Sequence, residues 1–369
     1  MKDISLCVMT RELCHELFQG WENDPAIYVD MERFTPYRYD EKAVDRYFDA
    51  KQEPSRVLLA IMKDKTPIGE IQLKRIDRER KACTLSIHMQ NDAVKERGYG
   101  TQAERLAIRY ALGVLGMKAV YADTAIKNTR SQHVLEKVGF QYLREENGFK
   151  YYRYEPEREL HESIAAFMAW AKANAPGITE ARDYNEWDFG EAFAAMTSCA
   201  MNVIRNCPAE RATEQLINDL LFVIARDHES ESMIDELLDH DEWFAMLCKN
   251  SLKTNDPDAK WQFAAYLGRY EGHGDTRAWI EDFLSCGDEY TERRALASLA
   301  AIDPQRAEAY AAYFWNRNQY GNDEYQKMTA LSVLDQIHSS KLPTYLEMAE
   351  HSDYEYLRCL AQEIRSRRP

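Results

Sequence analysis

The segment Lys95-Glu96-Arg97-Gly98-Tyr99-Gly100 has the composition of a loop that holds a phosphate group. Its two glycines let the backbone approach an anion closely, because they carry no side chain and tolerate a positive φ. The predicted helix that follows begins with unpaired N–H groups and the positive end of its dipole. We therefore expect the backbone N–H groups from Arg97 to Gly100, with Thr101 nearby, to bind a pyrophosphate.

The elements on both sides of this loop are those that such a site needs. Upstream, residues 84–89 alternate polar and apolar side chains, which predicts a half-buried strand. Downstream, apolar residues recur every three or four positions over residues 103–115 and form one helix face. A short strand at 119–122 and a second helix at 128–139 follow, and a glycine ends each helix.

This order of elements resembles the GNAT superfamily of acetyl-CoA-dependent N-acetyltransferases. The residues that carry the resemblance are Lys95-x-x-Gly98-x-Gly100, Asn128-x-x-Ser131 and Leu135-Glu136-Lys137-Val138-Gly139-Phe140. The last two forms are similar to those of the subgroup that includes the ribosomal-protein N-acetyltransferases. The resemblance covers about residues 1–156 and implies an α/β domain with a mixed sheet flanked by helices. Lys95 stands where the family has Gln or Arg, which keeps a cation near the phosphates.

The resemblance also implies how acetyl-CoA would be held as a co-substrate. A backbone N–H near Met89, at the end of the strand at 82–89, would polarise the thioester carbonyl, because this strand diverges from its neighbour in the fold. One such fixed donor is worth about 3 kcal/mol in other enzymes. Asn128 would hydrogen-bond the pantetheine arm. The pyrophosphate would lie at Lys95, Arg97, Gly98, Tyr99, Gly100 and Thr101.

Acetyl transfer to an amine also needs a base and an acid. Glu70 and His88 are the candidate bases, on strands that border the expected cleft, and a chain of ordered waters is the alternative. Histidine has a suitable unperturbed pKa of about 6.5, whereas burial would have to raise that of Glu70. Much of the superfamily uses a tyrosine as the acid, but this chain has Leu135 there. Ser131 is the candidate near the sulfur, and otherwise it only starts a helix.

Residues 18–39 are the segment predicted to bind the amine acceptor, because six aromatic side chains are interleaved there with four carboxylates. Carboxylates and aromatic rings attract a cationic amine through charge and cation–π contacts. Core aromatics and surface acids would give the same composition. The acceptor class therefore stays open between a polyamine, an antibiotic, a nucleotide sugar, a protein N-terminus and a lysine side chain.

The composition is typical of a globular protein rather than a membrane protein. The chain has 369 residues, of which 45% are hydrophobic and 30% charged, and this length is enough for two domains. No run of about 18 apolar residues occurs, and the first residues lack the apolar region of a signal peptide. The eight cysteines are scattered without a C-x-x-C pair, which predicts reduced thiols in the cytoplasm and no metal site.

Charge divides the chain sharply. Residues 1–157 contain 26 Lys and Arg residues and 25 Asp and Glu residues. The whole chain contains 47 and 62, so residues 158–369 contain 21 and 37. The net charges are thus +1 and −16. An acidic half repels phosphate backbones, which argues against nucleic-acid binding and favours a basic protein partner or a cationic ligand.

The remaining elements of the domain at 1–156 follow from its hydrophobic patterns. Asn147-Gly148 would join the last two strands in a hairpin. Strands are expected at 4–8, 57–62, 68–73, 82–89, 141–143 and 149–154, and helices at 11–21 and 41–50.

Residues 157–369 form a second domain with helical patterns and no convincing strand. An acidic residue and a Tyr precede helices with Leu and Ala positions, and the tyrosines are spaced by 35 and 31 residues. This period predicts HEAT-like helical pairs, with a plain bundle as the alternative, and places the Tyr and Leu positions in the core. The copies are Asp288-Glu289-Tyr290, Asp323-Glu324-Tyr325, Asp353-Tyr354-Glu355-Tyr356 and, more weakly, Asp256-Pro257-Asp258.

Two functions are consistent with these residues. The first is an N-acetyltransferase, an acyltransferase whose acidic helical domain docks a substrate or partner. The second is a non-catalytic interaction or scaffold protein that keeps a CoA-binding or degenerate GNAT fold. The glycine loop and Asn128 favour the first, and the missing tyrosine leaves room for the second. A purely structural helical domain, or one that forms a homodimer, is the alternative to docking.

Overall fold

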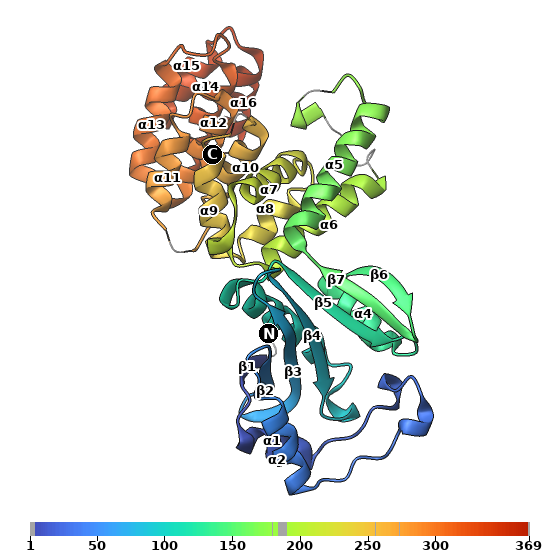
Figure 1. Ribbon diagram of the computed structural model, residues 1–369. Coiled ribbons are helices and arrows are strands. Elements are labelled where there is room, and N and C mark those ends of the chain that lie inside the picture. Colours follow the sequence, from blue (N-terminus) through green and yellow to red (C-terminus); the bar gives the residue numbers. More distant parts are fainter. Residues whose placement is uncertain (1–3, 179, 184–189, 255, 273, 368–369) are drawn as a thin grey trace. The chain divides into compact units, whose positions relative to one another are not determined.

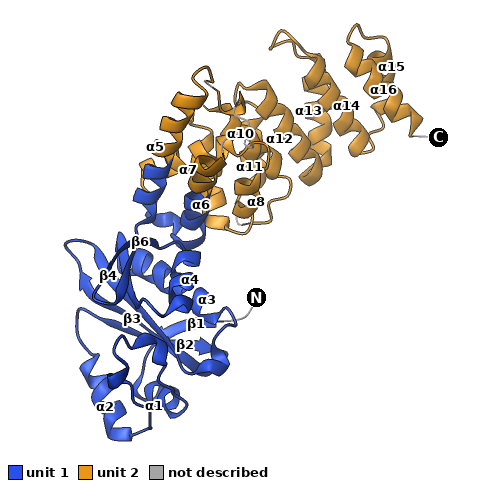
Figure 2. Ribbon diagram, turned by 90° about the vertical axis from the view of Figure 1, so that its right-hand side faces the viewer, with its two compact units in different colours: residues 1–163, 198–212 blue, residues 164–197, 213–369 orange. Residues whose placement is uncertain are grey.

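The computed structural model describes residues 4–178, 180–183, 190–254, 256–272 and 274–367. Its contacts divide the chain into two compact units (Figures 1 and 2). Unit 1 contains residues 1–163 and 198–212, and unit 2 contains residues 164–197 and 213–369. Unit 1 therefore combines the residues expected in the N-terminal domain with a segment from the helical half of the sequence.

Unit 1 is built on one mixed sheet with the strand order β1-β2-β3-β4-β5-β7-β6. Neighbouring strands are antiparallel except β4 and β5, which are parallel. The expected fold class, a mixed sheet with helices followed by an all-helical region, is thereby confirmed. The strands are β1 (Ile4–Val8), β2 (Val57–Lys63), β3 (Thr66–Asp77), β4 (Ala82–Met89), β5 (Ala119–Ala125), β6 (Gln141–Glu146) and β7 (Phe149–Tyr154).

Helices cover both faces of this sheet. Leu58, Ala60 and Met62 of β2 pack with α1 and α2 in one core cluster, while α3 contacts β1, β3, β4 and α4. Successive residues of β2 are buried on both faces, as expected for a central strand between two helical layers. The helices are α1 (Arg11–Gln19), α2 (Glu41–Ala50), α3 (Tyr99–Arg109) and α4 (Thr129–Val138).

The helix expected over residues 103–115 changes its winding near its end. After α3, residues Tyr110–Val114 form a π-helical turn, and Gly116 has a φ of +69°. Pro208 packs on this turn, because a Cβ at Gly113 would lie 3.0 Å from its Cγ. Arg211 also donates a hydrogen bond of 2.9 Å to the carbonyl of Gly113. The segment 198–212 thus holds the end of this helix.

The same segment covers the C-terminal part of α4 and the end of β7. The hydroxyl of Tyr154 donates to the carbonyl of Asn202 at 3.1 Å, and the side chain of Asn206 donates to the carbonyl of Val138 at 3.2 Å. Gly139 has a φ of +113°, and a Cβ there would lie 2.8 Å from Asn202. The end of α4 is therefore shaped to fit segment 198–212.

The described residues of unit 2 are helical and contain no strand. One row of helices runs in contact from α10 to α12, α14 and α16. Each helix between two of these along the chain contacts both of them: α11 contacts α10 and α12, α13 contacts α12 and α14, and α15 contacts α14 and α16. The HEAT-like nature of this stack stays a prediction. The helices are α7 (Glu214–Arg226), α8 (Ser232–Leu237), α9 (Asp241–Ser251), α10 (Pro257–Tyr266), α11 (Thr276–Phe283), α12 (Glu289–Ile302), α13 (Pro304–Asn316), α14 (Glu324–Gln336), α15 (Leu342–Glu350) and α16 (Glu355–Ser366), with α5 (Pro156–Asn174) and α6 (Gly190–Asn206) divided between the units.

The repeated positions are buried only in part. Leu331 and Leu334 are fully buried, but Tyr325 and Tyr356 are 46% and 59% exposed, so the expectation of core tyrosines is wrong for these two. At 100° per residue, Tyr325 lies about 120° and 180° around the helix from these leucines. Its ring is instead 5.4 Å from the guanidinium of Arg293.

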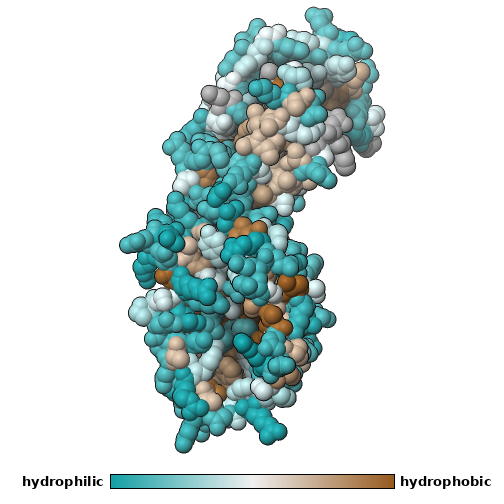
Figure 3. Space-filling view, turned by 45° about the vertical axis from the view of Figure 1, so that its right-hand side comes forward, coloured by the Kyte–Doolittle hydropathy of each residue, from teal (hydrophilic) through white to brown (hydrophobic). Residues whose placement is uncertain are grey.

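Hydrophilic side chains cover most of the face seen in Figure 3. Within the described ranges, no helix has the length and apolar content that crossing a bilayer requires. All eight cysteines are free.

Candidate functional site

The glycine loop ends at the N-terminus of α3. Gly98 is the N-cap residue with a φ of +80°, and no side chain among the described residues caps the helix. A Cβ added at Gly98 would meet no described atom within 4 Å, and one at Gly100 would meet only Ile87, at 4.0 Å. The first turn carries no acidic residue. The loop thus leaves free space beside the first N–H groups of α3, as a bound pyrophosphate requires.

Lys95 is already engaged by carboxylates. Its Nζ lies 2.6 Å from Asp24 and 2.8 Å from Asp92, and its side chain is 11% exposed. Burial alone would lower the pKa of Lys95, but these hydrogen bonds outweigh burial and raise it. A phosphate would have to compete with two carboxylates for this cation, so a phosphate-binding role for Lys95 stays a prediction.

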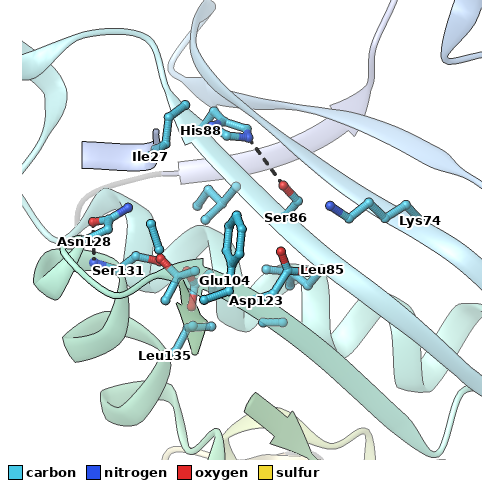
Figure 4. A pocket seen from close by; sticks show the side chains of 15 residues that line it. Ile27, Lys74, Leu85, Ser86, His88, Glu104, Asp123, Asn128, Ser131 and Leu135 are labelled. Atoms are coloured by element: carbon cyan, nitrogen blue, oxygen red, sulfur yellow. Dashed lines mark hydrogen bonds between the residues drawn. The ribbon is translucent and has the colours of Figure 1, made fainter. Parts of the chain in front are cut away.

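A cavity of about 230 Å³ lies where β4 and β5 diverge (Figure 4). The two strands pair only from Ala82 and Ala119 to Leu85 and Ala122, although β4 still pairs with β3 as far as Met89. The β5-facing edge of residues 86–89 therefore has no strand partner in the described chain. The cavity is lined by Ile27, Lys74, Leu85, Ser86, Ile87, His88, Glu104, Ala122, Asp123, Thr124, Ala125, Asn128, Ser131, Leu135 and Phe149.

These residues come from both faces of the sheet. Alternation along β4 places Ser86 and His88 on one face, and Ile87 on the face of α3, beside Gly100. Figure 4 shows His88 and Ser86 on one side of the strand and Glu104 with Ser131 on the other. The gap between β4 and β5 therefore opens the sheet from one face to the other.

His88 lines the cavity as the predicted base would. Its Nε2 lies 3.4 Å from the hydroxyl of Ser86, and its ring centroid lies 6.3 Å from that of Trp21. Burial lowers the pKa of the imidazole below 6.5, although the carboxylate of Glu70 opposes this shift. At pH 7 the ring is thus neutral and can accept a proton.

Glu70, the other candidate base, lies beside His88 but does not line the cavity. Its side chain is 2% exposed. Its Oε1 accepts hydrogen bonds from the hydroxyl of Tyr47 at 2.6 Å and from the amide of Gln72 at 2.8 Å. Tyr47 and Gln72 hold this carboxylate on the neighbouring strand, one step removed from the cavity.

Asn128 and Ser131 both line the cavity at the start of α4. The side-chain oxygen of Asn128 accepts a hydrogen bond of 3.2 Å from the backbone N–H of Ser131. Asn128 therefore caps the helix, and its amide group remains at the cavity wall. Met89 does not line the cavity and lies opposite Gly69 at the end of β4. The role of its backbone N–H as a donor to the thioester carbonyl stays a prediction.

Glu104 is a cavity residue that the sequence analysis missed. It lies on α3 one turn after Gly100, its side chain is 1% exposed, and its Oε2 has no hydrogen-bond partner among the described residues. Burial raises the pKa of Glu104 to about 8. The available signal was its spacing, because Glu104 precedes the fully buried Ala107 and Ile108 by three and four positions.

The acceptor segment at 18–39 borders the cavity through Ile27, in the short helix Pro25–Ile27. Two of its four carboxylates bind within the protein. Asp24 pairs with Lys95, and Asp30 accepts a hydrogen bond from the backbone N–H of Glu32 at 3.0 Å. Attraction of a cationic amine by this segment stays a prediction. Among the described side chains, no group of His, Cys, Asp and Glu is arranged to hold a metal ion.

Comparison with known proteins identifies the domain that contains this cavity. The family model of the acetyltransferase (GNAT) domain matches residues 6–141, so unit 1 contains a GNAT acetyltransferase domain. This match does not distinguish the ribosomal-protein subgroup. A search of curated protein sequences finds no match to the chain.

Solved structures similar to the chain include the following acetyltransferases. A probable acetyltransferase is 18% identical over 42% of this chain and 94% of its own, with a TM-score of 0.35. The N-acetyltransferase PseH of Campylobacter jejuni is 18% identical in sequence, and the match covers 41% of this chain and 97% of PseH, with a TM-score of 0.32. The spermidine N-acetyltransferase of Vibrio cholerae, in a dodecameric structure, is 15% identical in sequence. The match covers 47% of this chain and 98% of that enzyme, with a TM-score of 0.33.

Proposed function

We propose that this protein is an acetyl-CoA-dependent N-acetyltransferase that acts on a primary amine. The observation that carries the proposal is the cavity at the divergence of β4 and β5, which joins the face of α3 and the glycine loop to the face of His88. A thioester bound on the first face and an amine on the second would meet in this gap. A non-catalytic scaffold has no need of such an opening.

The residues of the loop and the cavity fit acetyl-CoA. The N–H groups at the start of α3 bind the pyrophosphate, next to glycines that leave it room. Asn128 and the free edge of β4 offer hydrogen bonds to the pantetheine arm and the thioester carbonyl. When bound, the co-substrate supplies the acetyl group. His88 takes the proton that the amine loses.

We also propose that unit 2 docks the amine-bearing substrate or a basic partner. Residues 158–369 carry a net charge of −16 against +1 for residues 1–157. Charge of this size attracts cations over a Debye length of about 8 Å in physiological salt. This role is separate from the transfer chemistry, so a small amine would react without it.

Calorimetric titration with acetyl-CoA tests the proposed function. The wild-type chain should bind acetyl-CoA, and Gly100→Glu should abolish binding because its carboxylate would lie where the pyrophosphate binds. Gly100→Gln is the matched control, with the same length and no charge. We expect Gly100→Gln to bind acetyl-CoA at least 10-fold more tightly than Gly100→Glu does.

Turnover is then measured as thiol release with polyamines, amino sugars and peptides with a free N-terminus. Failure of the wild-type chain to bind acetyl-CoA would overturn the enzyme proposal. Binding without turnover of any amine would favour the scaffold.

A further inference from the structure

The carboxyl group of Glu104 is buried in the cavity wall without a partner for one of its oxygens. Only 1% of the residue is exposed, and Oε2 finds no hydrogen bond within the described chain. An unpartnered buried polar group costs stability, and native structures contain few of them. Glu104 lines the cavity, so a ligand bound there could supply the missing partner.

The surroundings of Glu104 keep its carboxyl protonated. Burial is the cause of its raised pKa of about 8, with no charged neighbour contributing. α4 presents Asn128, Ser131 and Leu135 to the cavity. The other titratable side chains that line the cavity are Lys74 on β3, His88 on β4 and Asp123 on β5. The strands that carry them and β1, which α3 also contacts, further contain Glu70, Arg75, Asp77, Cys83, Tyr121 and Cys7. At pH 7 Glu104 is therefore a neutral acid that can donate a proton.

We propose that Glu104 is the general acid that protonates the sulfur of CoA as it leaves. The inference rests on the proposed function, acetyl transfer, and assigns a residue to the second proton transfer of that reaction, the one to sulfur. On this wall of the cavity, Glu104 is the only described side chain with an acidic proton, since Ser131 and Thr124 offer aliphatic hydroxyls and Leu135 is apolar. A thiol has a pKa of about 8.5, close to that of Glu104, which suits efficient proton transfer.

The proton balance is complete with groups already described. As the bond between the acyl carbon and sulfur breaks, its electron pair stays on sulfur, and Glu104 donates its proton to that atom and becomes a carboxylate. The amine nitrogen, now bound to the acyl carbon, loses its proton to His88. Solvent restores the proton to Glu104 and takes up that of His88 after the products leave. No oxidant, reductant or further co-reactant is needed.

Glu104→Gln separates proton donation from hydrogen bonding, because a glutamine amide still donates a hydrogen bond but releases no proton. We expect kcat to fall about 100-fold or more, while the affinity for acetyl-CoA, measured by calorimetry, changes less than 3-fold. In the wild-type protein, kcat/KM should fall above about pH 8 as Glu104 ionises, and this decline should be absent from the variant.

Infrared difference spectroscopy gives a readout that needs no turnover. The wild-type protein should show the carbonyl band of a protonated carboxyl that disappears with a midpoint near pH 8, and Glu104→Gln should lack it. Glu159→Gln is the matched control. Burial also raises the pKa of Glu159, to about 7, but Glu159 lies on α5 and does not line the cavity. This variant should keep the wild-type kcat and the decline above pH 8.

The outcomes distinguish the two proposals. If the wild-type protein acetylates an amine but Glu104→Gln keeps its rate or its decline above pH 8, the role of Glu104 is wrong and the enzyme proposal stands. If Glu104→Gln loses acetyl-CoA affinity together with its rate, Glu104 is a binding residue and the inference fails. If Glu104→Gln does not fold, Glu104→Asp replaces it, and loss of the high-pH decline in this acid-retaining variant would overturn the inference. If the wild-type protein binds no acetyl-CoA, the proposed function fails, and with it the role of Glu104.

Discussion

In the proposed mechanism His88 accepts the proton of the amine, and its environment sets the pH at which it can do so. Because burial lowers the pKa of its imidazole below 6.5, the ring loses its proton below neutral pH and is a base throughout the physiological range. We expect the acidic decline in kcat/KM of the wild-type protein, which accompanies protonation of His88, to lie below pH 6.5. His88→Gln should lower kcat by about 100-fold and remove this acidic decline.

Glu70→Gln is the comparison for His88, because Glu70 lies beside His88 and outside the cavity. It should keep the acidic decline but move it to lower pH, because the carboxylate of Glu70 raises the pKa of His88. It should also lower stability, since one oxygen of Glu70 accepts hydrogen bonds from Tyr47 and Gln72. An acidic decline that survives in His88→Gln and disappears in Glu70→Gln would reverse these roles. A decline that survives in both would point to a chain of waters.

At the scale of residues, sequence motifs predicted which residues stand at the helix starts beside the cavity, and their roles stay predictions. Gly98, Gly100, Asn128 and Ser131 were found because each has a fixed position relative to the start of a helix. The pairing of Lys95 with Asp24 joins residues 71 positions apart, which no local pattern reports. Glu104 was missed because a single acidic residue beside an apolar helix face is usually solvated.

At the scale of elements, the pattern of alternating side chains predicted the sheet well. The strands expected at 4–8, 82–89 and 149–154 have those bounds, and the hairpin turn has positive φ at Asn147 and Gly148. β3 runs beyond the expected residue 73 to Asp77, because its pairing with β4 continues to Ala82 past an irregularity. The π-helical turn after α3 was not predictable, since Pro208 and Arg211, far along the chain, hold it.

The fit between α4 and segment 198–212 predicts different costs at two glycines. Gly116→Ala introduces a side chain at φ +69° into open space, so we expect a loss of about 1 kcal/mol from backbone strain alone. Gly139→Ala adds a contact 2.8 Å from Asn202 at φ +113° and should cost at least twice as much.

Hydrogen exchange of β7 and α4 in the full chain measures this difference. In Gly139→Ala, the amides of both elements should exchange faster than in Gly116→Ala. Equal protection in the two variants would show that segment 198–212 does not pack tightly on the end of α4.

At the scale of the whole molecule, the sequence showed where composition changes but not where the compact units divide. Charge and helical patterns change near residue 157, yet unit 1 also needs residues 198–212. That dependence arises from contacts between distant residues, such as those of Tyr154 with Asn202 and of Val138 with Asn206. Periodicity within each segment holds no information about them.

Two truncations test this division of the chain. A chain that ends after Glu157 lacks the partners of Tyr154 and Val138 and should aggregate or melt far below the full protein. In a chain that ends after Ala212, unit 1 is complete and should fold. Calorimetry should show that this chain binds acetyl-CoA as tightly as the full protein does. Equal melting of the two truncated chains would contradict the role of segment 198–212.

The longer truncated chain also tests docking by unit 2. It should acetylate a small amine at the full rate and lose activity toward the natural acceptor. For the full chain, affinity for a basic acceptor should weaken from about 50 to 200 mM salt, because exposed charges are screened over this range. An affinity that does not change with salt would exclude electrostatic docking.

The position of segment 198–212 late in the chain also affects how the protein is made. Ribosomes add about 5–20 residues per second, so roughly 3 to 11 seconds separate the synthesis of residue 157 from that of residue 212. During this interval the seven strands are complete, but the end of α4 and Tyr154 lack their cover. The nascent sheet must wait for a helix that belongs partly to the next unit, and until then its uncovered surface is prone to aggregation.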